Sequence, residues 1–259
     1  MRKIAIGLIG FGKTGRLVAT EIIKDPECVL RWVVRESARG SRKYASRVLG
    51  FRGNAGKIFP LEKAIKKGFL RQNRVDVIID FSSASALPQY ARLAAAEGIR
   101  IVSAVSKYGE EELALLHQIS RRTSVLHSPN ITTGINIVTV MALVLRKLFP
   151  DADVEIIEEH FRDKREVSGT ALRIASLLEI DPQKQVNSVR VGGIIGNHEI
   201  IFGMRNQTLR VRHESVTRSA FGRGAIYAAK WVARSPKGFY TMEEVIRDKF
   251  LKLLRELAT

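Results

Sequence analysis

The feature that most constrains the fold is a glycine-rich segment near the N-terminus, Gly10-Phe11-Gly12-Lys13-Thr14-Gly15. It follows a short apolar run at residues 3–9, typical of a buried strand, and opens a helical pattern at residues 14–24. In this setting the first glycine permits a tight turn, the second lets a pyrophosphate approach the backbone, and the third allows close helix–strand packing. The segment therefore predicts a dinucleotide site at the helix N-terminus, where unpaired N–H groups favour anions.

Short apolar runs alternate with helical patterns through the first half of the chain. Further strands are predicted at residues 29–34, 75–81, 100–104 and 124–127, and helices at residues 87–97 and 110–121. Alternation at this spacing predicts right-handed crossovers. The sequence thus predicts an α/β fold, with a Rossmann-type doubly wound parallel sheet covered by helices on both faces.

The pattern changes after Asn130. A long apolar helix is predicted at residues 134–149, strands at 154–161, 188–194, 199–204 and 208–213, and further helices at 172–178, 219–233 and 241–257. A turn-forming segment at residues 235–238 separates the last two helices. Short, turn-rich connections between the strands favour an antiparallel or mixed sheet. We therefore expect a second α+β domain with a mixed sheet, beginning near Thr132.

The chain is strongly basic, with a formal net charge of +17 over 259 residues. Solvated basic faces, an anionic ligand or nucleic acid would each explain this excess. No helix-turn-helix spacing, zinc finger or RNA-binding aromatic motif is present, which disfavours nucleic acid as a partner. Cys28 is the only cysteine, which excludes an intrachain disulfide and a cysteine-rich zinc module, and no metal site is predicted. Because no apolar run approaches the length a bilayer needs, we expect a cytoplasmic protein without a membrane partner.

The end of the second predicted strand bears on the choice of nicotinamide cofactor. An acid at this place hydrogen-bonds the ribose 2′-OH of NAD, whereas an arginine suits the 2′-phosphate of NADP. The strand ends in Arg35-Glu36, and Arg39, Arg42 and Lys43 follow. This basic neighbourhood favours NADPH over NADH, while Glu36 keeps NADH open.

A third group of residues combines acid–base and anion-binding groups. His160 ends a predicted strand, and Lys164 lies in the loop beyond it. Ser168-Gly169-Thr170 begins the next helical pattern, where hydroxyls and backbone N–H groups are available to a carboxylate. Together they suit an anionic substrate that must also be protonated. The alternative is a structural or merely exposed histidine near a lysine.

The order Glu-Ile-Ile-Glu-x-His, Lys, Ser-Gly-Thr-Ala downstream of a dinucleotide motif is specific. It belongs to a wider set of matching segments at residues 10–15, 80–82, 130–136, 154–160, 168–171, 190–198, 213–215 and 218–221. In these segments the chain resembles the 4-hydroxy-tetrahydrodipicolinate reductase (dihydrodipicolinate reductase) family. These are nicotinamide-dependent enzymes of lysine and diaminopimelate synthesis.

The resemblance implies a nucleotide-binding domain at residues 1–131, completed by the C-terminal helix within 235–259. It also implies a substrate-binding and oligomerisation domain at 132–234 that builds a homotetramer. Hydride would pass from the nicotinamide to a small anionic cyclic imine, and the catalytic His160 or the proton-donating Lys164 would supply the proton. The carboxylate contacts that it implies come from Ser168, Gly169 and Thr170. The further cofactor contacts that it implies come from Arg35, Phe81, Ser103-Ala104-Val105 and Ser128-Pro129-Asn130-Ile131.

Departures from the family pattern lie mostly around the substrate. The family's Gly-Thr-Thr-Gly loop corresponds here to Ser103-Ala104-Val105-Ser106, and Phe161 replaces a histidine. The loop between Lys164 and Ser168 is shorter than in the family, and Thr14 replaces the usual methionine. Two alternatives therefore stay open: a divergent member acting on another amino-acid-derived imine, and a nucleotide-binding factor without catalysis.

Overall fold

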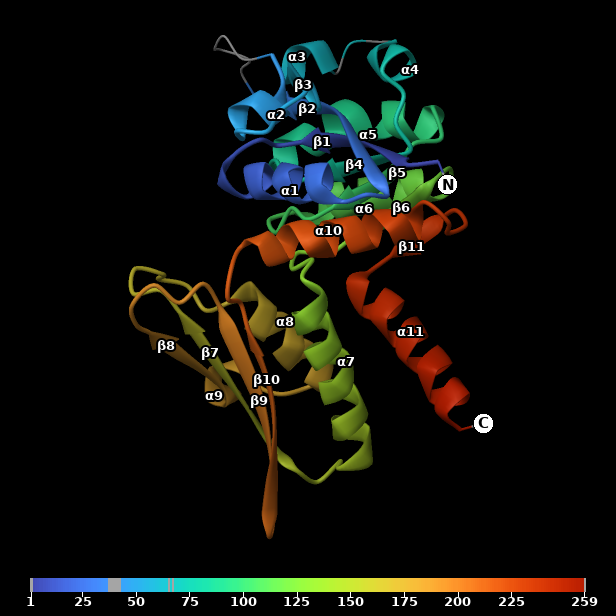
Figure 1. The fold of residues 1–259 in the computed structure, drawn as a ribbon. Helices are drawn as coiled ribbons and strands as arrows, with labels where there is room; N and C mark the ends of the chain where they lie inside the picture. The colour runs from blue at the N-terminus through green and yellow to red at the C-terminus, as the bar shows by residue number, and fades with distance from the viewer. Residues whose placement is uncertain (1, 37–42, 65, 67, 259) are drawn as a thin grey trace. The chain divides into compact units, whose positions relative to one another are not determined.

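The computed structural model describes residues 2–36, 43–64, 66 and 68–258, which form two compact units (Figure 1). The first unit contains Met1–Thr132 and Phe221–Met242, and the second contains Thr133–Ala220 and Glu243–Thr259. Each unit therefore combines segments that are far apart in the sequence. Within the described ranges, no helix is both long enough and apolar enough to cross a membrane.

The first unit is built on a seven-stranded sheet in which every adjacent pair of strands is parallel. In spatial order, the strands are β11 (Gly238–Tyr240), β6 (Ser124–His127), β5 (Arg100–Ser103), β4 (Val77–Asp80), β1 (Ile4–Ile9), β2 (Cys28–Arg35) and β3 (Lys57–Pro60). The chain order reverses between β4 and β1, which is where open α/β sheets bind their ligands. The predicted Rossmann-type parallel sheet is therefore confirmed.

Helices cover both faces of this sheet, so the central strand β4 is buried along its whole length. The longer helices are α1 (Lys13–Lys24), α5 (Leu87–Ala96), α6 (Glu110–Ser120) and α10 (Ser219–Val232). One core cluster contains Trp32 and Tyr90, both 2% exposed. The Trp32 ring lies where a Cβ on Gly7 would be only 2.2 Å from it, so the neighbouring strand β1 requires glycine at that position.

Several short elements of the first unit were not predicted. Strand β3, the short helices α2 (Ala45–Val48), α3 (Leu61–Ala64) and α4 (Phe69–Gln72), and the 3₁₀ turn η1 (Ala84–Ala86) have no counterpart in the predicted elements. Strand β11 lies partly in the segment 235–238 that we read as a break between helices. These elements are only three or four residues long, too short to show a hydrophobic period.

The compact units divide the chain differently from the predicted domains. Helix α10, expected in the domain at 132–234, lies with the first unit from Phe221 onward. Its glycines explain why: a Cβ on Gly222 would be 2.8 Å from the Glu21 side chain of α1, and one on Gly224 would be 2.0 Å from the Ile131 carbonyl oxygen. The C-terminal helix α11 (Met242–Leu257), expected with the first domain, lies with the second unit from Glu243 onward.

The second unit contains a four-stranded sheet in the order β10-β9-β7-β8. Its strands are β7 (Asp153–His160), β8 (Val186–Arg190), β9 (Asn197–Met204) and β10 (Gln207–Glu214). The β7–β8 pair is parallel and the other pairs are antiparallel, which confirms the predicted mixed sheet. The helices α7 (Thr133–Leu148), α8 (Gly169–Leu178) and α9 (Pro182–Gln185) complete the part of this unit that precedes α11.

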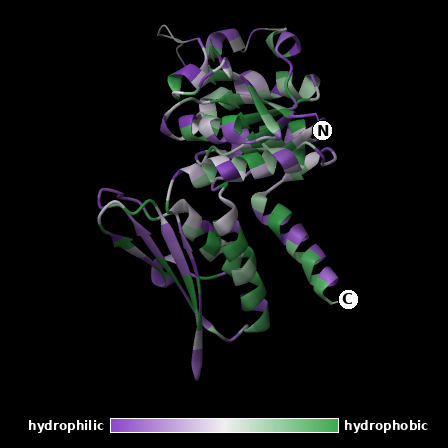
Figure 2. Ribbon diagram, viewed as in Figure 1, coloured by the Kyte–Doolittle hydropathy of each residue, from purple (hydrophilic) through white to green (hydrophobic). Residues whose placement is uncertain are grey.

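The core of the second unit lies between α7, α8 and one face of the mixed sheet. Along β7 the residues alternate, so that Val154 and Ile156 are buried and their neighbours are partly or fully exposed. Figure 2 shows mostly hydrophobic colouring along α7 and mostly hydrophilic colouring on the edge strand β10. Glu158 and His160 continue the inward series of β7, so an acid and a histidine occupy core positions.

Candidate active site

A cavity of about 650 Å³ lies at the carboxyl ends of β1, β2 and β4 in the first unit. Its lining includes the predicted cofactor residues Gly10, Phe11, Gly12, Arg35 and Phe81. The remaining lining residues are Ile9, Val34, Glu36, Leu61, Ser82, Ser83, Ser85, Ala86 and Gln89. The cavity thus occupies the switch point of the sheet and brings the glycine-rich turn to the end of β2.

The three glycines of the motif meet different surroundings. Gly10 has a φ of +93°, and a Cβ there would be 2.5 Å from the Phe81 carbonyl oxygen. A Cβ on Gly15 would be 2.0 Å from the Gly10 carbonyl oxygen, so this glycine allows the helix to approach the turn. A Cβ on Gly12, by contrast, would meet no heavy atom within 4 Å. Gly12 is also the N-cap of α1 and has no side chain that could accept from the first N–H groups of the helix. The turn therefore leaves both room and N–H donors for a phosphate.

The other predicted cofactor residues lie around this turn or on neighbouring strand ends. Lys13, Thr14 and Gly15 form the first turn of α1. Ser103 ends β5, and Ala104 and Val105 follow it. The Ser128 N–H donates to the Ser103 carbonyl at 3.0 Å, so Ser128-Pro129-Asn130-Ile131 begins beside that strand end. These residues do not line the 650 Å³ cavity. Arg39 and Arg42 lie outside the described residues.

A buried polar cluster fixes the loops at the ends of β4 and β5. The Asp80 carboxylate is fully buried and accepts hydrogen bonds from the Ser82 N–H at 2.8 Å and the Tyr90 hydroxyl at 2.7 Å. Tyr108 bridges to the next strand, because its hydroxyl lies 2.8 Å from Ser103 Oγ and 3.5 Å from Asp80. Burial raises the pKa of Asp80, against the opposing effect of these donors.

The second cluster follows from strand register in the mixed sheet. Glu158 on β7 lies opposite Ser188 on β8 and His198 on β9, and His198 lies opposite His213 on β10. Directly paired residues point to the same face, so these four side chains form one row across the sheet. His160 lies on the same face, two residues beyond Glu158.

In the next row of the sheet, one position beside His160 carries no side chain. His160 pairs with Arg190 on β8, and Gly196 lies on its other side. A Cβ on Gly196 would be 2.8 Å from His160 Nε2, so the imidazole occupies space that any other residue would fill.

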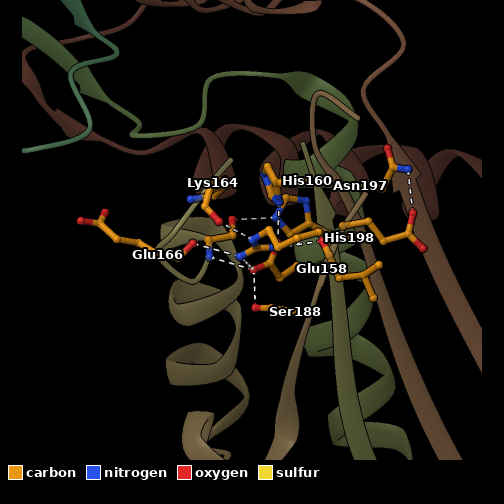
Figure 3. Close-up of polar contacts among 11 residues, drawn as sticks. Glu158, His160, Lys164, Glu166, Ser188, Asn197 and His198 are labelled. Carbon is orange, nitrogen blue, oxygen red and sulfur yellow. Dashed lines mark hydrogen bonds and ion pairs between the residues drawn. The ribbon is translucent and has the colours of Figure 1, made fainter. Parts of the chain in front are cut away.

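Glu158 is the centre of the cluster, where dashed contacts converge in Figure 3. Its carboxylate is completely buried and accepts a bidentate pair from Arg190, at 2.8 and 2.5 Å. It also accepts from Ser188 Oγ at 2.5 Å, the Ser168 N–H at 3.2 Å and His160 Nδ1 at 2.5 Å. Burial by itself raises the pKa of Glu158, but these donors, Arg190 foremost, outweigh it and lower the pKa from 4.5 to about 2.

Burial determines the charge of His160, and the ionised carboxylate determines its tautomer. Burial lowers the pKa of His160 below its usual value of 6.5, although Glu158 opposes this effect. His160 is therefore neutral at neutral pH. Because the Glu158 carboxylate can only accept, the single imidazole proton lies on Nδ1, and Nε2 carries a lone pair on the side of Gly196.

The remaining predicted residues of the second unit lie in the loop after β7 and at the start of α8. Lys164 follows His160 in the loop, half-buried, and its carbonyl accepts from Arg190 Nε at 2.8 Å. Ser168 caps α8 through its backbone position, while its hydroxyl contacts His198 Nε2 at 2.9 Å. A Cβ on Gly169 would meet no heavy atom within 4 Å, so there is open space beside the first residue of α8, and Thr170 stands in its first turn. His160, Lys164 and the α8 N-terminus are thus grouped in one unit.

We assigned no role to Glu158, Arg190 or His198 from the sequence. The sequence signal for Glu158 was its place on a strand of alternating pattern, where it is an acid at an inward position. His160 occupies the next inward position, two residues later. The partner of Glu158, Arg190, could not be found in this way, because the pairing depends on the β7–β8 register. In the part of the chain that the structure describes, no group of three or more His, Cys, Asp or Glu side chains could hold a metal.

Family models match nearly all of the chain. The model described as dihydrodipicolinate reductase, N-terminus, matches residues 4–131, and that described as dihydrodipicolinate reductase, C-terminus, matches residues 134–246. The 4-hydroxy-tetrahydrodipicolinate reductase of Archaeoglobus fulgidus is 29% identical over 260 residues, covering 91% of this chain and 96% of that protein. That of Syntrophobacter fumaroxidans is 33% identical over 199 residues, covering 68% of this chain and 74% of that protein.

Solved structures share the fold at lower identity. Dipicolinate-bound dihydrodipicolinate reductase from Paenisporosarcina sp. TG-14 has a TM-score of 0.76 and 22% identity, and the match covers 94% of this chain and 99% of that one. The Corynebacterium glutamicum DAP dehydrogenase in complex with DAP has a TM-score of 0.62 and 14% identity, with 94% of each chain covered. The resemblance inferred from sequence is confirmed by the two family models: the chain belongs to the dihydrodipicolinate reductase family and is an NAD(P)-dependent oxidoreductase.

Proposed function

We propose that this enzyme reduces 4-hydroxy-tetrahydrodipicolinate to tetrahydrodipicolinate with NADPH, as a step of lysine and diaminopimelate synthesis. The observation that carries this proposal is the grouping of neutral His160, Lys164 and the N-terminus of α8. This set suits a small anionic imine, because it offers N–H donors for a carboxylate and a cation beside a neutral base. The names of the curated relatives support the same substrate.

In this proposal the nicotinamide supplies the hydride, and the residues of the second unit bind the substrate and manage its proton. The Gly169 N–H, at the first position of α8, holds one carboxylate at the helix N-terminus. His160 commits its imidazole proton to Glu158, so the Lys164 ammonium is the group with a proton to give. Lys164 also offsets the negative charge of the substrate.

A direct assay tests this proposal against its alternatives. Purified enzyme is mixed with NADPH and enzymatically generated 4-hydroxy-tetrahydrodipicolinate, and oxidation of the cofactor is followed by absorbance. We expect saturable turnover, and its absence at high enzyme concentration would contradict the proposal. Exposed Phe161, which stands where the family has a histidine, favours a second candidate, a more apolar amino-acid-derived imine. Turnover of such an imine in place of the dipicolinate precursor would support that alternative.

The preference for NADPH rests on Arg35, which ends β2 and lines the cavity beside Glu36. Replacing Arg35 with Ala should lower kcat/KM for NADPH about 10- to 100-fold, because a charge-assisted hydrogen bond to a phosphate contributes about 1.5–3 kcal/mol. The value for NADH should change little. Arg31→Ala is a matched control, because Arg31 is exposed on the same strand and does not line the cavity. Equal losses with both cofactors would contradict a role at the 2′-phosphate.

We also propose that the enzyme is a cytoplasmic homotetramer assembled through the second unit. The exposed side chains of Val189 and Val191, on and next to the edge strand β8, support a contact there. Light scattering coupled to size-exclusion chromatography tests the assembly, and a monomeric mass at micromolar concentration would contradict it.

A further inference from the structure

A fully buried carboxylate with a dedicated cation adjoins the proposed catalytic histidine, and the proposed reaction gives it no task of its own. Glu158 makes no contact that requires substrate, because its hydrogen-bond partners Ser168, Ser188, Arg190 and His160 all belong to the chain itself. A buried ion pair of this kind is weak evidence for stability, because desolvation offsets much of the Coulombic attraction. The position of the pair suggests another role.

Hydrogen bonds fix the orientation of both the Glu158 carboxylate and the Arg190 guanidinium. Arg190 donates to both carboxylate oxygens, and its guanidinium is itself held by the Lys164 carbonyl at 2.8 Å and the Glu166 carbonyl at 3.0 Å. Ser188 donates to Oε1 at 2.5 Å, so Oε2 remains directed at His160 Nδ1. The carboxylate therefore cannot rotate away from the imidazole without breaking several hydrogen bonds at once.

We propose that Glu158, fixed by Arg190, is a positioning residue that keeps His160 in the Nδ1–H tautomer, which leaves Nε2, beside Gly196, unprotonated and able to accept a hydrogen bond. The use of Nε2 in catalysis rests on the proposed function, whereas the tautomer itself does not depend on any substrate. Gly196 leaves room for the imidazole in this orientation, because a Cβ there would lie 2.8 Å from Nε2. Without the Glu158 carboxylate, Nδ1 loses the acceptor that favours the tautomer with the proton on Nδ1.

Several charged and titratable groups of the second unit surround His160. Glu158 shares its strand, Arg190 lies on β8, His198 lies on β9 and Lys164 lies in the following loop. The His160 and His198 rings meet edge to face, with centroids 5.5 Å apart. Of these neighbours, only Glu158 favours the protonated imidazole. Removal of its charge should therefore shift the acid limb of a His160-dependent pH profile to lower pH.

The decisive experiment compares Glu158→Gln with the wild-type enzyme by ¹⁵N NMR of the histidine side chains and by steady-state kinetics. In the wild type we expect protonated Nδ1 and unprotonated Nε2 at His160. The glutamine amide can donate to Nδ1, so the variant should move the proton to Nε2, lower kcat about 10- to 100-fold and leave KM nearly unchanged. Glu158→Asp keeps the charge and should retain the wild-type tautomer and recover part of kcat.

Glu159→Gln is the matched control, because Glu159 is the next residue of β7, faces the other side of the sheet and bonds to Asn197 and Arg212. It should leave the tautomer, kcat and the pH profile unchanged. A His160 that is protonated on Nε2 in the wild type overturns the proposal, even if Glu158→Gln does not fold. An unchanged tautomer with unchanged kcat in a folded Glu158→Gln variant also overturns it. If the wild type shows the expected tautomer but does not reduce the dipicolinate precursor, the proposed substrate fails and the tautomer assignment stands.

Discussion

At the scale of single residues, the chemistry depends on where side chains are absent as much as on where they are present. Gly196 leaves the space in which the His160 imidazole lies, and Gly12 leaves open space at the start of α1. Gly7 gives the same kind of room to an apolar ring, that of Trp32. Each glycine is therefore tied to one particular neighbour or to one open volume.

The Gly196→Ala substitution tests the first of these relations. The new methyl would lie 2.8 Å from His160 Nε2, so the imidazole must rotate or shift. We expect a loss of stability of about 1–3 kcal/mol, as for other overpacked sites, and a fall in kcat larger than that of a surface substitution. Urea unfolding and steady-state kinetics measure the two effects. Unchanged kcat in the alanine variant would show that the gap has no bearing on His160.

Some of these residues could be recognised from the sequence and others could not. The glycine-rich turn, His160 and Lys164 lie in local motifs whose spacing carries their meaning. Glu158 and Arg190 are 32 positions apart, and only the parallel register of β7 and β8 brings them together. The contact between Glu158 and His160 is local to β7, but the Arg190 that fixes the carboxylate could not be found from a local pattern.

At the scale of elements, the turn between β1 and α1 combines two requirements that a paired substitution can separate. Gly15→Ala places a Cβ 2.0 Å from the Gly10 carbonyl oxygen, whereas Gly12→Ala meets no atom within 4 Å and has an ordinary φ of −77°. The first should destabilise the protein by several kcal/mol, because backbone cannot yield cheaply. The second should fold normally but bind NADPH more weakly, since the methyl fills the space for the phosphate.

Thermal unfolding and cofactor titration by fluorescence distinguish these outcomes. A Gly12→Ala variant that binds NADPH as tightly as the wild type would place the phosphates elsewhere. A Gly15→Ala variant with unchanged stability would contradict the close approach of helix and turn.

The elements that were predicted and those that were missed differ in length. The long helices and buried strands carry a clear period, and the predicted helix at 134–149 matches α7 within one residue at each end. Strand β11 has only three residues and begins at Gly238, where φ is +157°. It follows directly on Ser235-Pro236-Lys237, so the sequence of this segment is typical of a turn. Its strand character comes from pairing with β6, which is a tertiary contact.

At the scale of the whole molecule, the two units should respond differently to acid. Burial lowers the pKa of His198 to about 3, and the pKa of Glu158 lies at about 2. Both folded-state values lie below the unfolded ones, so both groups contribute stability that is lost as pH falls, from about 6.5 for His198 and from about 4.5 for Glu158. Burial raises the pKa of Asp80 in the first unit, so its contribution has the opposite sign and is lost as pH rises.

The two tryptophans of the chain, Trp32 and Trp231, both lie in the first unit, so they separate the responses. On acidification below pH 6.5 we expect far-UV circular dichroism to report loss of the second unit before tryptophan fluorescence changes. His198→Gln should flatten the stability curve between about pH 6.5 and 4.5, because the titrating group is gone. Coincident transitions at every pH, or a curve unaltered by the substitution, would contradict this assignment of acid sensitivity to the second unit.

The contribution of β11 to the first sheet has a consequence for the order in which the chain is made. Residues 238–240 form one edge of a sheet whose other strands all lie before residue 128, and Lys230 of the same late segment bonds to Asp25 and Glu27. During synthesis the β6 edge and the surface that α10 covers therefore stay exposed until almost all of these residues have left the ribosome. An open strand edge invites pairing with other nascent chains. The strands and helices of residues 133–220 emerge before most of α10 and before β11, so the first sheet receives its last strand only after the middle of the chain has been made.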